Sequence, residues 1–501
     1  MIARTYCAER LGIDGFVVSV EATIGPGLRG LTVVGQVCGP LYESGLRVGA
    51  ALGACGFALA PCKQLVNVAP AGLRKYAGMD LAIACALLVC HGVISAESLD
   101  GVLSWGELGP DGSVRPVVGT LIAADAASQH GFRRLVVACE SAREAAIIAT
   151  LDVVPVSSLR QLVAYLRGEA SAVSAPRGVA VAPEREPVIG ESALDLADLR
   201  DPVTRLALEV MVAGGHHLLV RGPAGSAKTI SRSLPCLLPE LDDADALVLT
   251  KLHHARSSTG WLRVPQIRRP PPTVSAVELL GGGTPPQPGE ISLAHQGVLV
   301  LDDLPRFSQT CMDGLRRAIH EGAVTIGRVR FPARFRLLAS AGPRLDLIPE
   351  PLLDAIDLVV PLFAGSRAEV ASPILEGHRQ ERLAVARARQ HDRLAGTAWR
   401  CNAEIPASGP VNAQLCPLTP AAERLLAELS WPGGLESREP RRIRRIARTI
   451  ADLEIGREPA APIDVDAVRL AARLRELSAS SAVAFGHENS KRRQLKLLRA
   501  E

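Results

Sequence analysis

The residues of this chain that could do chemistry begin with a short glycine-containing segment. In order, it consists of Gly222, Pro223, Ala224, Gly225, Ser226, Ala227, Lys228 and Thr229. Backbone N–H groups of such a loop converge on a β-phosphate, Lys228 would meet the β- and γ-phosphate oxygens, and Thr229 would offer its hydroxyl to Mg²⁺. Glycine is usual before the lysine, and the methyl group of Ala227 would crowd the phosphate and resist a positive φ. The alternative is a glycine-rich turn before a helix, with a chance Lys-Thr pair.

Two adjacent acids form the second candidate group. The apolar run 297–301 ends at Asp302 and Asp303. Asp302 would hold Mg²⁺ through water, and Asp303 would orient the attacking water as a base. The alternative is a capped turn between a strand and a helix.

The surrounding pattern predicts the elements that position these groups. A helix is expected over 202–213, and strands over 217–221, 297–301 and 335–340, and the composition changes after 357–362. The glycine-containing segment thus lies between a strand and a helix, which is the context that a phosphate-binding loop needs.

The whole chain is predicted to be of the α/β class, in five parts. Residues 1–167 alternate strand-like runs (16–23, 31–34, 65–68 and 135–138) with alanine-rich helical patterns (42–55, 80–91, 121–130 and 142–150). Residues 168–193 mix Ser, Pro, Ala and Val without a period, as a linker does. A nucleotide-binding core over 194–364, a helical lid over 365–478 and a basic tail over 479–501 follow.

Composition limits the classes of protein that the chain can represent. Of 501 residues, 48% are hydrophobic, 22% are charged and 3% are aromatic, and the formal net charge of +4 favours no particular partner. Neither a secretory signal nor a run of about 20 apolar residues occurs. The 11 cysteines include no C-x-x-C pair, so buried thiols are favoured over zinc or disulfides. A cytoplasmic protein is expected.

Several strings in the chain resemble the ComM/YifB family of magnesium chelatase-like AAA+ ATPases. They include Ala213-Gly-Gly-His-His-Leu-Leu, Pro288-Gly-Glu-Ile-Ser-Leu-Ala-His295, Phe331-Pro-Ala-Arg-Phe335 and Val66-Asn-Val-Ala-Pro-Ala71. The resemblance extends from residue 8 to about 475. It implies ATP and Mg²⁺ as cofactors, an AAA+ core with a helical lid, a Lon-protease-like first domain, and a hexameric ring that moves DNA branches during recombination.

The chain departs from this family at four positions that serve hydrolysis. Ala227 replaces glycine, Asp303 replaces the usual glutamate, Gly342 stands at the sensor-1 asparagine, and Ala355 stands at the arginine finger. Arg438 falls at the sensor-2 position. A finger alone contributes 10³–10⁵ in rate, so we expect nucleotide binding with weak or lost hydrolysis. A fully active branch-migration motor and a non-enzymatic ring scaffold or partner-binding protein are the alternatives.

The Lon-like resemblance implies no peptidase, because the serine position falls on Asp80 and the lysine position on Leu121. A structural or partner-binding role is expected for this domain.

Basic clusters make DNA a candidate partner. They comprise Arg328, Arg330 and Arg334 around a hairpin expected over 324–331, and Arg441, Arg444 and Arg445 on a helix with an apolar stripe, besides a basic tail over 491–499. A solvated helix face that also supplies a nucleotide sensor is the alternative for the second cluster. Scarce aromatic residues argue against base stacking.

Overall fold

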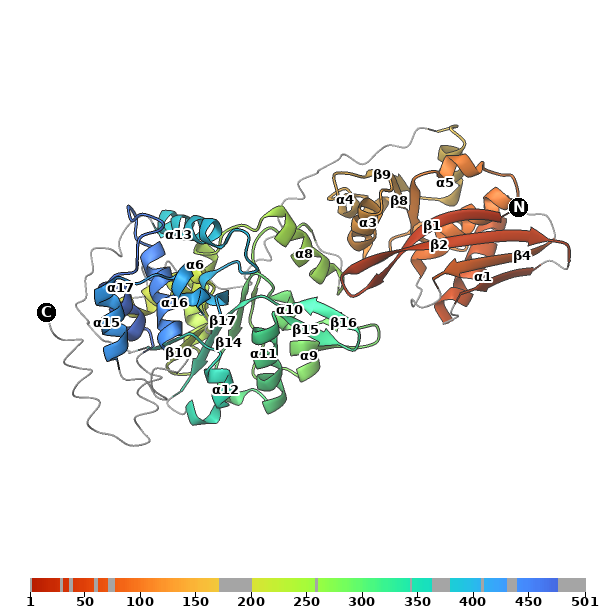
Figure 1. Cartoon of the computed structure of the whole chain (residues 1–501). Coiled ribbons are helices and arrows are strands. Elements are labelled where there is room, and N and C mark those ends of the chain that lie inside the picture. Colours follow the sequence, from red (N-terminus) through yellow and green to blue (C-terminus); the bar gives the residue numbers. More distant parts are fainter. Residues whose placement is uncertain are drawn as a thin grey trace. The chain divides into compact units, whose positions relative to one another are not determined.

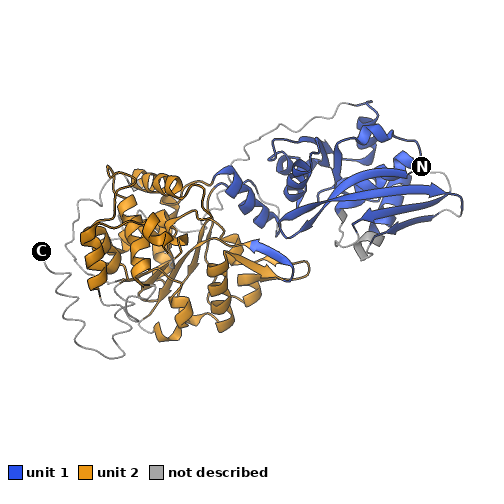
Figure 2. Cartoon of the chain, in the orientation of Figure 1, with its two compact units in different colours: residues 1–185, 242–263, 327–331 blue, residues 186–241, 264–326, 332–501 orange. Residues whose placement is uncertain are grey.

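Figure 1 shows the computed structural model of the chain. It describes residues 2–27, 30–35, 39–57, 62–70, 77–170, 201–256, 260–342, 345–362, 379–406, 410–429 and 439–475. The chain forms two compact units, coloured separately in Figure 2. Unit 1 contains residues 1–185, 242–263 and 327–331, and unit 2 contains residues 186–241, 264–326 and 332–501. Each unit has hydrophobic cores of its own.

Unit 1 is built on two sheets. The first has the strand order β1-β2-β4-β3, and the second, β5-β8-β9, is parallel. Their bounds are β1 Ile2–Leu11, β2 Asp14–Gly25, β3 Gly30–Val34, β4 Lys63–Ala69, β5 Val102–Trp105, β8 Arg134–Ala138 and β9 Asp152–Val156. A short pair, β6 Glu107–Leu108 and β7 Val114–Arg115, is antiparallel.

The helices of unit 1 pack on these sheets. They are α1 Gly39–Ala54, α2 Asp80–Cys90, α3 Thr120–Gln129, α4 Ala142–Ala145, α5 Leu159–Leu166 and α8 Asp243–His254. Every residue of α2 is buried, as expected of a helix that is apolar on all sides. Helix α8 is distant in sequence, yet Lys251 Nζ lies 2.7 Å from Asp125 Oδ2 and His254 Nδ1 lies 2.6 Å from Glu144 Oε1. This ion pair and this hydrogen bond hold α8 against the rest of unit 1.

Unit 2 contains a five-stranded parallel sheet with the order β11-β14-β17-β10-β18. The strands are β10 Leu218–Arg221, β11 Ile267–Arg268, β14 Val298–Leu301, β17 Arg336–Ala341 and β18 Leu358–Pro361. Successive residues of β10 enter different cores: Leu218 and Val220 join one, and Leu219 joins the other. A parallel sheet covered on both faces explains why its strands are continuous apolar runs.

Helices cover both faces of this sheet (Figure 1). One core joins the sheet to α6 Pro202–Gly214 and to the lid helices α13 Arg379–Leu394, α14 Val411–Leu415, α15 Pro420–Glu428, α16 Glu439–Asp452 and α17 Val465–Arg473. The other core contains residues of α9 Ala276–Leu280, α10 Glu290–Leu293, α11 Gln309–Glu321 and α12 Glu350–Leu353. The remaining pairs of strands are β12 Gly281–Gly282 with β13 Gln287–Pro288, and β15 Ala323–Ile326 with β16 Val329–Pro332.

The predicted α/β class is confirmed, and the expected elements around the glycine-containing segment all form within two residues of their expected ends. The structure adds β1, β5 and β9, which the pattern did not indicate, and it ends α4 at Ala145 rather than near residue 150. The expected core and lid both fall in unit 2, apart from 242–263 and 327–331. Most of the predicted linker and the whole predicted tail lie outside the described residues.

Candidate nucleotide-binding site

The glycine-containing segment lies where β10 ends. Leu218, Leu219 and Val220 are fully buried, so the strand is fixed in the centre of unit 2 and delivers the loop at its carboxyl end. The loop closes tightly: Ser226 Oγ donates to the carbonyl oxygen of Pro223 at 2.6 Å, and α7 Ser226–Ile230 follows at once. Gly225 has a φ of 93°, a conformation that glycine adopts without strain.

Asp302 reaches this loop from the end of β14. Its Oδ2 accepts a hydrogen bond from Gly225 N at 2.6 Å, and its Oδ1 accepts one from Ala227 N at 3.2 Å. Since β17 lies between β14 and β10, the carboxylate bridges two strands that are not neighbours. The predicted meeting of Asp302 with the loop is therefore present in the fold.

The loop residues fit an anion. Backbone N–H groups of Gly225 and Ala227 converge on one carboxylate, which here stands in for the phosphate that such a nest of donors binds. Lys228 and Thr229 are exposed on the short helix α7. They follow Ala227 directly in the chain and offer the kinds of group, an ammonium and a hydroxyl, that could hold a phosphate and Mg²⁺.

Ala227 differs from the sequence-based expectation. It lies inside α7 and its methyl group is fully buried in the core. The expectation that this position needs a positive φ is wrong, because the helix begins one residue earlier, at Ser226. The backbone N–H of Ala227 is directed to the Asp302 carboxylate all the same.

Ser340 is a site residue that sequence reasoning missed. Its Oγ donates to Asp302 Oδ1 at 2.7 Å and accepts from Asp303 N at 2.9 Å. The side chain is fully buried on β17. A hydroxyl in an otherwise apolar strand that ends beside the loop was the available signal, since buried polar groups need partners.

Asp303 has an unusual backbone. Its φ of 58° and ψ of 59° place it in the left-handed region, where a non-glycine residue is uncommon and often marks a functional site. Its Oδ2 lies 3.9 Å from Arg306 Nε. This conformation turns the chain sharply at the end of β14, so that Asp302 and Asp303 point differently.

The positions expected for the arginine finger and for sensor 1 carry no polar side chain. Gly342 follows β17, and Ala355 lies between α12 and β18. The lid holds the Ala355 loop by its backbone: Arg475 Nη1 donates to Ile356 O at 2.6 Å and to Asp357 O at 2.9 Å, and Arg442 donates to Asp354 O. Arg438 lies outside the described residues.

The two basic clusters differ in how far their arginine side chains are exposed and how far other protein groups engage them. On α16, Arg445 donates to Ala403 O and Ile405 O at 2.7 and 2.8 Å and lies 3.1 Å from Asp357, while Arg444 lies 3.3 Å from Glu423. Arg441 is part-buried on the same helix. These contacts count against this helix as a DNA surface.

The hairpin presents its arginines more openly. Arg328 and Arg330 are exposed, and Arg334 is 43% exposed with Glu404 3.9 Å away.

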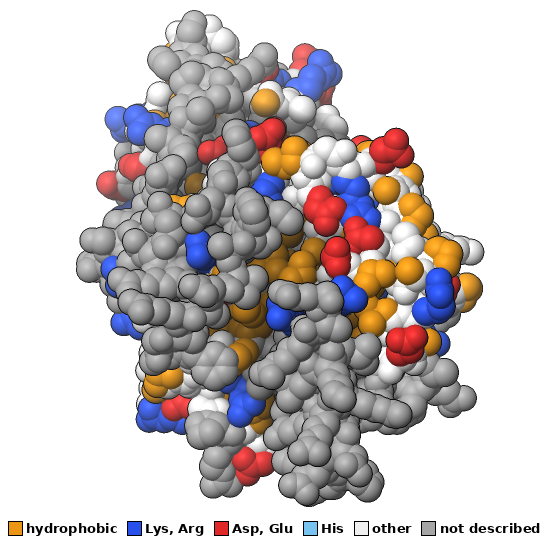
Figure 3. All heavy atoms as spheres, turned by 90° about the vertical axis from the view of Figure 1, so that its left-hand side faces the viewer, with side chains coloured by type: hydrophobic (Ala, Val, Ile, Leu, Met, Phe, Trp, Pro, Cys, Tyr) orange, Lys and Arg blue, Asp and Glu red, His pale blue; other side chains and the backbone are white. Residues whose placement is uncertain are grey.

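On the face drawn in Figure 3, the coloured basic side chains stand singly among acidic and apolar ones. The described part of that face therefore has no broad basic patch.

Unit 1 offers no peptidase pair at the expected positions. Asp80 is fully buried and lies 2.8 Å from Arg47 Nε, and Leu108 N donates to it at 3.1 Å. Burial raises the pKa of Asp80, and the hydrogen bonds from Arg47 and Leu108 offset this in part. Leu121 is buried on α3, so the position expected for a base carries an apolar side chain.

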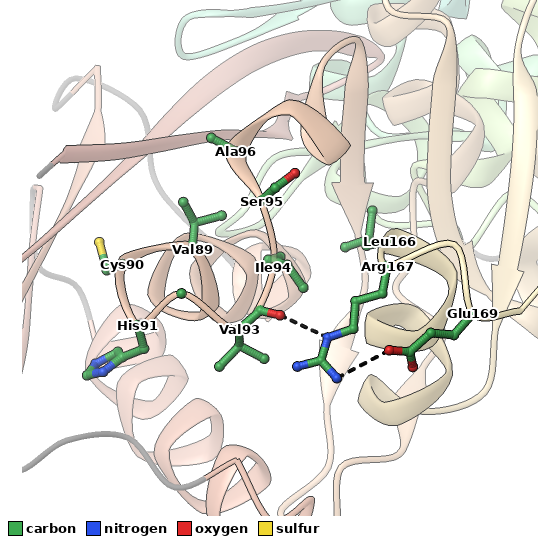
Figure 4. A pocket seen from close by; sticks show the side chains of 11 residues that line it. Val89, Cys90, His91, Val93, Ile94, Ser95, Ala96, Leu166, Arg167 and Glu169 are labelled. Carbon is green, nitrogen blue, oxygen red and sulfur yellow. Dashed lines mark hydrogen bonds and ion pairs between the residues drawn. The ribbon is translucent and has the colours of Figure 1, made fainter.

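A hollow of about 970 Å³ lies at the end of α2 in unit 1 (Figure 4). Arg167 contacts two other lining residues: its Nε donates to Val93 O at 2.9 Å, and its Nη1 lies 3.6 Å from Glu169. No described residues group three or more His, Cys, Asp or Glu side chains as a metal site would. Among the same residues no helix is long and apolar enough to cross a membrane.

Comparison with known proteins defines the class. The family model described as Magnesium chelatase, subunit ChlI, matches residues 195–345; Subunit ChlI of Mg-chelatase matches 20–141; and Magnesium chelatase, subunit ChlI C-terminal, matches 378–475. Together with the parallel sheet and its loop, these matches define a magnesium chelatase-like AAA+ protein.

Relatives that span nearly the whole chain give the family. An uncharacterized protein of Mycobacterium tuberculosis is 33% identical over 502 residues, covering 90% of this chain and 95% of that protein. YifB of Escherichia coli is 32% identical, with 89% and 92% covered, and Competence protein ComM of Haemophilus influenzae is 30% identical, with 90% and 94% covered. The chain belongs to the ComM/YifB family.

Proposed function

We propose that this chain binds ATP with Mg²⁺ at residues 222–229 and also binds DNA, with ATP hydrolysis weak or lost. The observation that carries the nucleotide site is the convergence of the Gly225 and Ala227 N–H groups on one anion, beside Lys228. Lys228 would contact phosphate oxygens, and Thr229 and Asp302 would hold the metal ion. Bound Mg²⁺ would neutralise charge on the phosphates.

Weak hydrolysis follows from the side chains around this site. Asp303 is shorter than glutamate by one methylene group, which would leave its carboxylate about 1 Å from the place where a water-orienting base acts. Gly342 has no group to guide that water, and Ala355 has no charge to offer a neighbouring subunit. The protein would hold nucleotide for long periods rather than consume it quickly.

DNA is the partner that the exposed hairpin arginines, Arg328 and Arg330, support best. A relative carries the name Competence protein ComM, which is consistent with a role in the uptake or recombination of DNA. We further propose a homo-oligomeric, hexameric ring in the cytoplasm, with unit 1 as a Lon-like structural or partner-binding domain.

Isothermal titration calorimetry tests the nucleotide site. ATP with Mg²⁺ should bind the natural chain, and Lys228→Ala should weaken binding by about tenfold or more, because charge-assisted hydrogen bonds to phosphate are lost. The matched control is Lys63→Ala, which removes an exposed lysine of β4. Equal affinity of the natural chain and Lys228→Ala would refute the site, and no binding at millimolar ATP would leave a non-enzymatic ring scaffold.

A further inference from the structure

The side chain that meets the phosphate-binding donors is an acid of the protein itself. Asp302 accepts hydrogen bonds from Gly225 N at 2.6 Å and Ala227 N at 3.2 Å. A carboxylate and a phosphate use such donors in the same way, through negatively charged oxygens. The same two N–H groups cannot serve both anions at once, so a phosphate at this loop must displace Asp302.

Ser340 holds Asp302 in this position. Its Oγ lies 2.7 Å from Asp302 Oδ1, and it also accepts from Asp303 N at 2.9 Å. Because Ser340 is fully buried on β17, between the strand that ends at Asp302 and the strand that delivers the loop, its hydroxyl is fixed relative to both. The Ser340 hydroxyl thereby holds the side chain of Asp302 and the backbone of Asp303 in place.

We infer that Asp302 is an internal competitor of the nucleotide phosphate and that Ser340 is the positioning residue which keeps it on the loop. This inference rests on the proposed nucleotide site. Bound Mg²⁺ would have a second role, because an Asp302 carboxylate held at the metal ion would leave the Gly225 and Ala227 N–H groups to the phosphate. Nucleotide binding is therefore coupled to metal binding through one side chain, and without metal Asp302 opposes the phosphate.

The test is ATP affinity measured by calorimetry in EDTA and in Mg²⁺. If Asp302 served only as a metal ligand, replacing it would leave the ATP affinity in EDTA unchanged. The competitor model predicts that Asp302→Ala raises the EDTA affinity by about tenfold, because two charge-assisted hydrogen bonds no longer oppose the phosphate. Asp302→Asn keeps the shape of the side chain and should raise it by a smaller factor, which keeps the test valid if the alanine variant does not fold.

Two controls separate competition from simpler effects. Asp303→Asn removes the adjacent charge without touching the loop donors, and it should leave the EDTA affinity nearly unchanged. Ser340→Ala should raise the ATP affinity measured in EDTA. Ser292 is another fully buried serine, and Ser292→Ala should not raise this affinity. If Ser340 had only a structural role, Ser340→Ala would change the ATP affinities in EDTA and in Mg²⁺ by the same factor.

The possible results separate a failure of the Asp302 competition from a failure of the proposed nucleotide site. A rise in EDTA affinity for the Asp302 variants alone supports competition. No rise, or an equal rise for Asp303→Asn, overturns it while the nucleotide site stands. Absence of ATP binding by the natural chain with Mg²⁺ overturns the proposed function and this inference together.

Discussion

Asp357 anchors the lid to the sheet, and its replacement by asparagine should destabilise unit 2 strongly. The carboxylate accepts from His216 Nδ1 and Arg445 Nη2, each at 3.1 Å, and Arg442 Nε lies 3.7 Å away. Burial alone would raise the pKa of Asp357, but Arg445 and His216 outweigh it and hold the pKa well below its usual range. The folded protein therefore depends on the charged form.

The magnitude follows from what the substitution leaves behind. Asparagine keeps the shape and one acceptor, yet Arg445, with only 11% of its side chain exposed, loses its counter-charge. Arg442, 6% exposed, loses one of its two and keeps Glu439. Breaking a buried ion pair costs about 3–5 kcal/mol. At about 2–4 °C per kcal/mol for a unit of this size, the lower bound of this cost predicts a fall of about 6–12 °C in the thermal midpoint.

Differential scanning calorimetry of Asp357→Asn beside Asp466→Asn tests this reasoning. Asp466 is 84% exposed and lies 3.6 Å from Arg469, so the same substitution there should leave the midpoint unchanged, since exposed ion pairs contribute little. A fall of less than about 2 °C for Asp357→Asn, under 1 kcal/mol on the same scale, would refute the claim that this network holds the lid.

Further predictions concern pH, DNA and the second basic cluster. Burial lowers the pKa of His217 from 6.5 to about 4, and its Nδ1 accepts from Leu337 N. Because folding favours the neutral imidazole, the stability that His217 contributes is complete above pH 6.5 and is lost as the pH falls towards about 4. His217→Gln should therefore reduce the change in the free energy of unfolding over this pH range, measured in urea, by up to about 3 kcal/mol. Replacing Arg328 and Arg330 by alanine should weaken DNA binding and reduce the slope of log affinity against log salt by about 2 in fluorescence anisotropy; a natural chain with no salt dependence would contradict DNA as partner. Arg445→Ala should lower the thermal midpoint and leave that slope unchanged; a reduced slope with an unchanged midpoint would restore α16 as a DNA surface.

Sequence patterns predicted the centre of unit 2 well. The strands around Leu218–Arg221 and Val298–Leu301 are continuous apolar runs bounded by polar or glycine residues, and such runs identify strands buried on both faces. The loop and Asp302 were expected together because each directly follows one of these predicted strands.

Other features depend on partners far away in the chain. Helix α8 belongs to unit 1 because Lys251 meets Asp125 and His254 meets Glu144, contacts that no local pattern predicts. Strand β1 was missed because its charged residues disguise the alternation, although Glu9 is buried in the fold. The role of Ser340 became visible only when β17 was placed between β14 and β10.

The central claim is a nucleotide site with impaired hydrolysis, and steady-state ATPase activity with DNA present tests it most directly. The natural chain should turn over very slowly, and Ala355→Arg alone should gain little, because catalytic groups that act as a unit are strongly non-additive. The fourfold variant Ala227→Gly, Asp303→Glu, Gly342→Asn and Ala355→Arg should be faster by orders of magnitude. A natural chain that already turns over at about 1 s⁻¹, an ordinary enzymatic rate, would contradict the account and show a working ATP-driven motor.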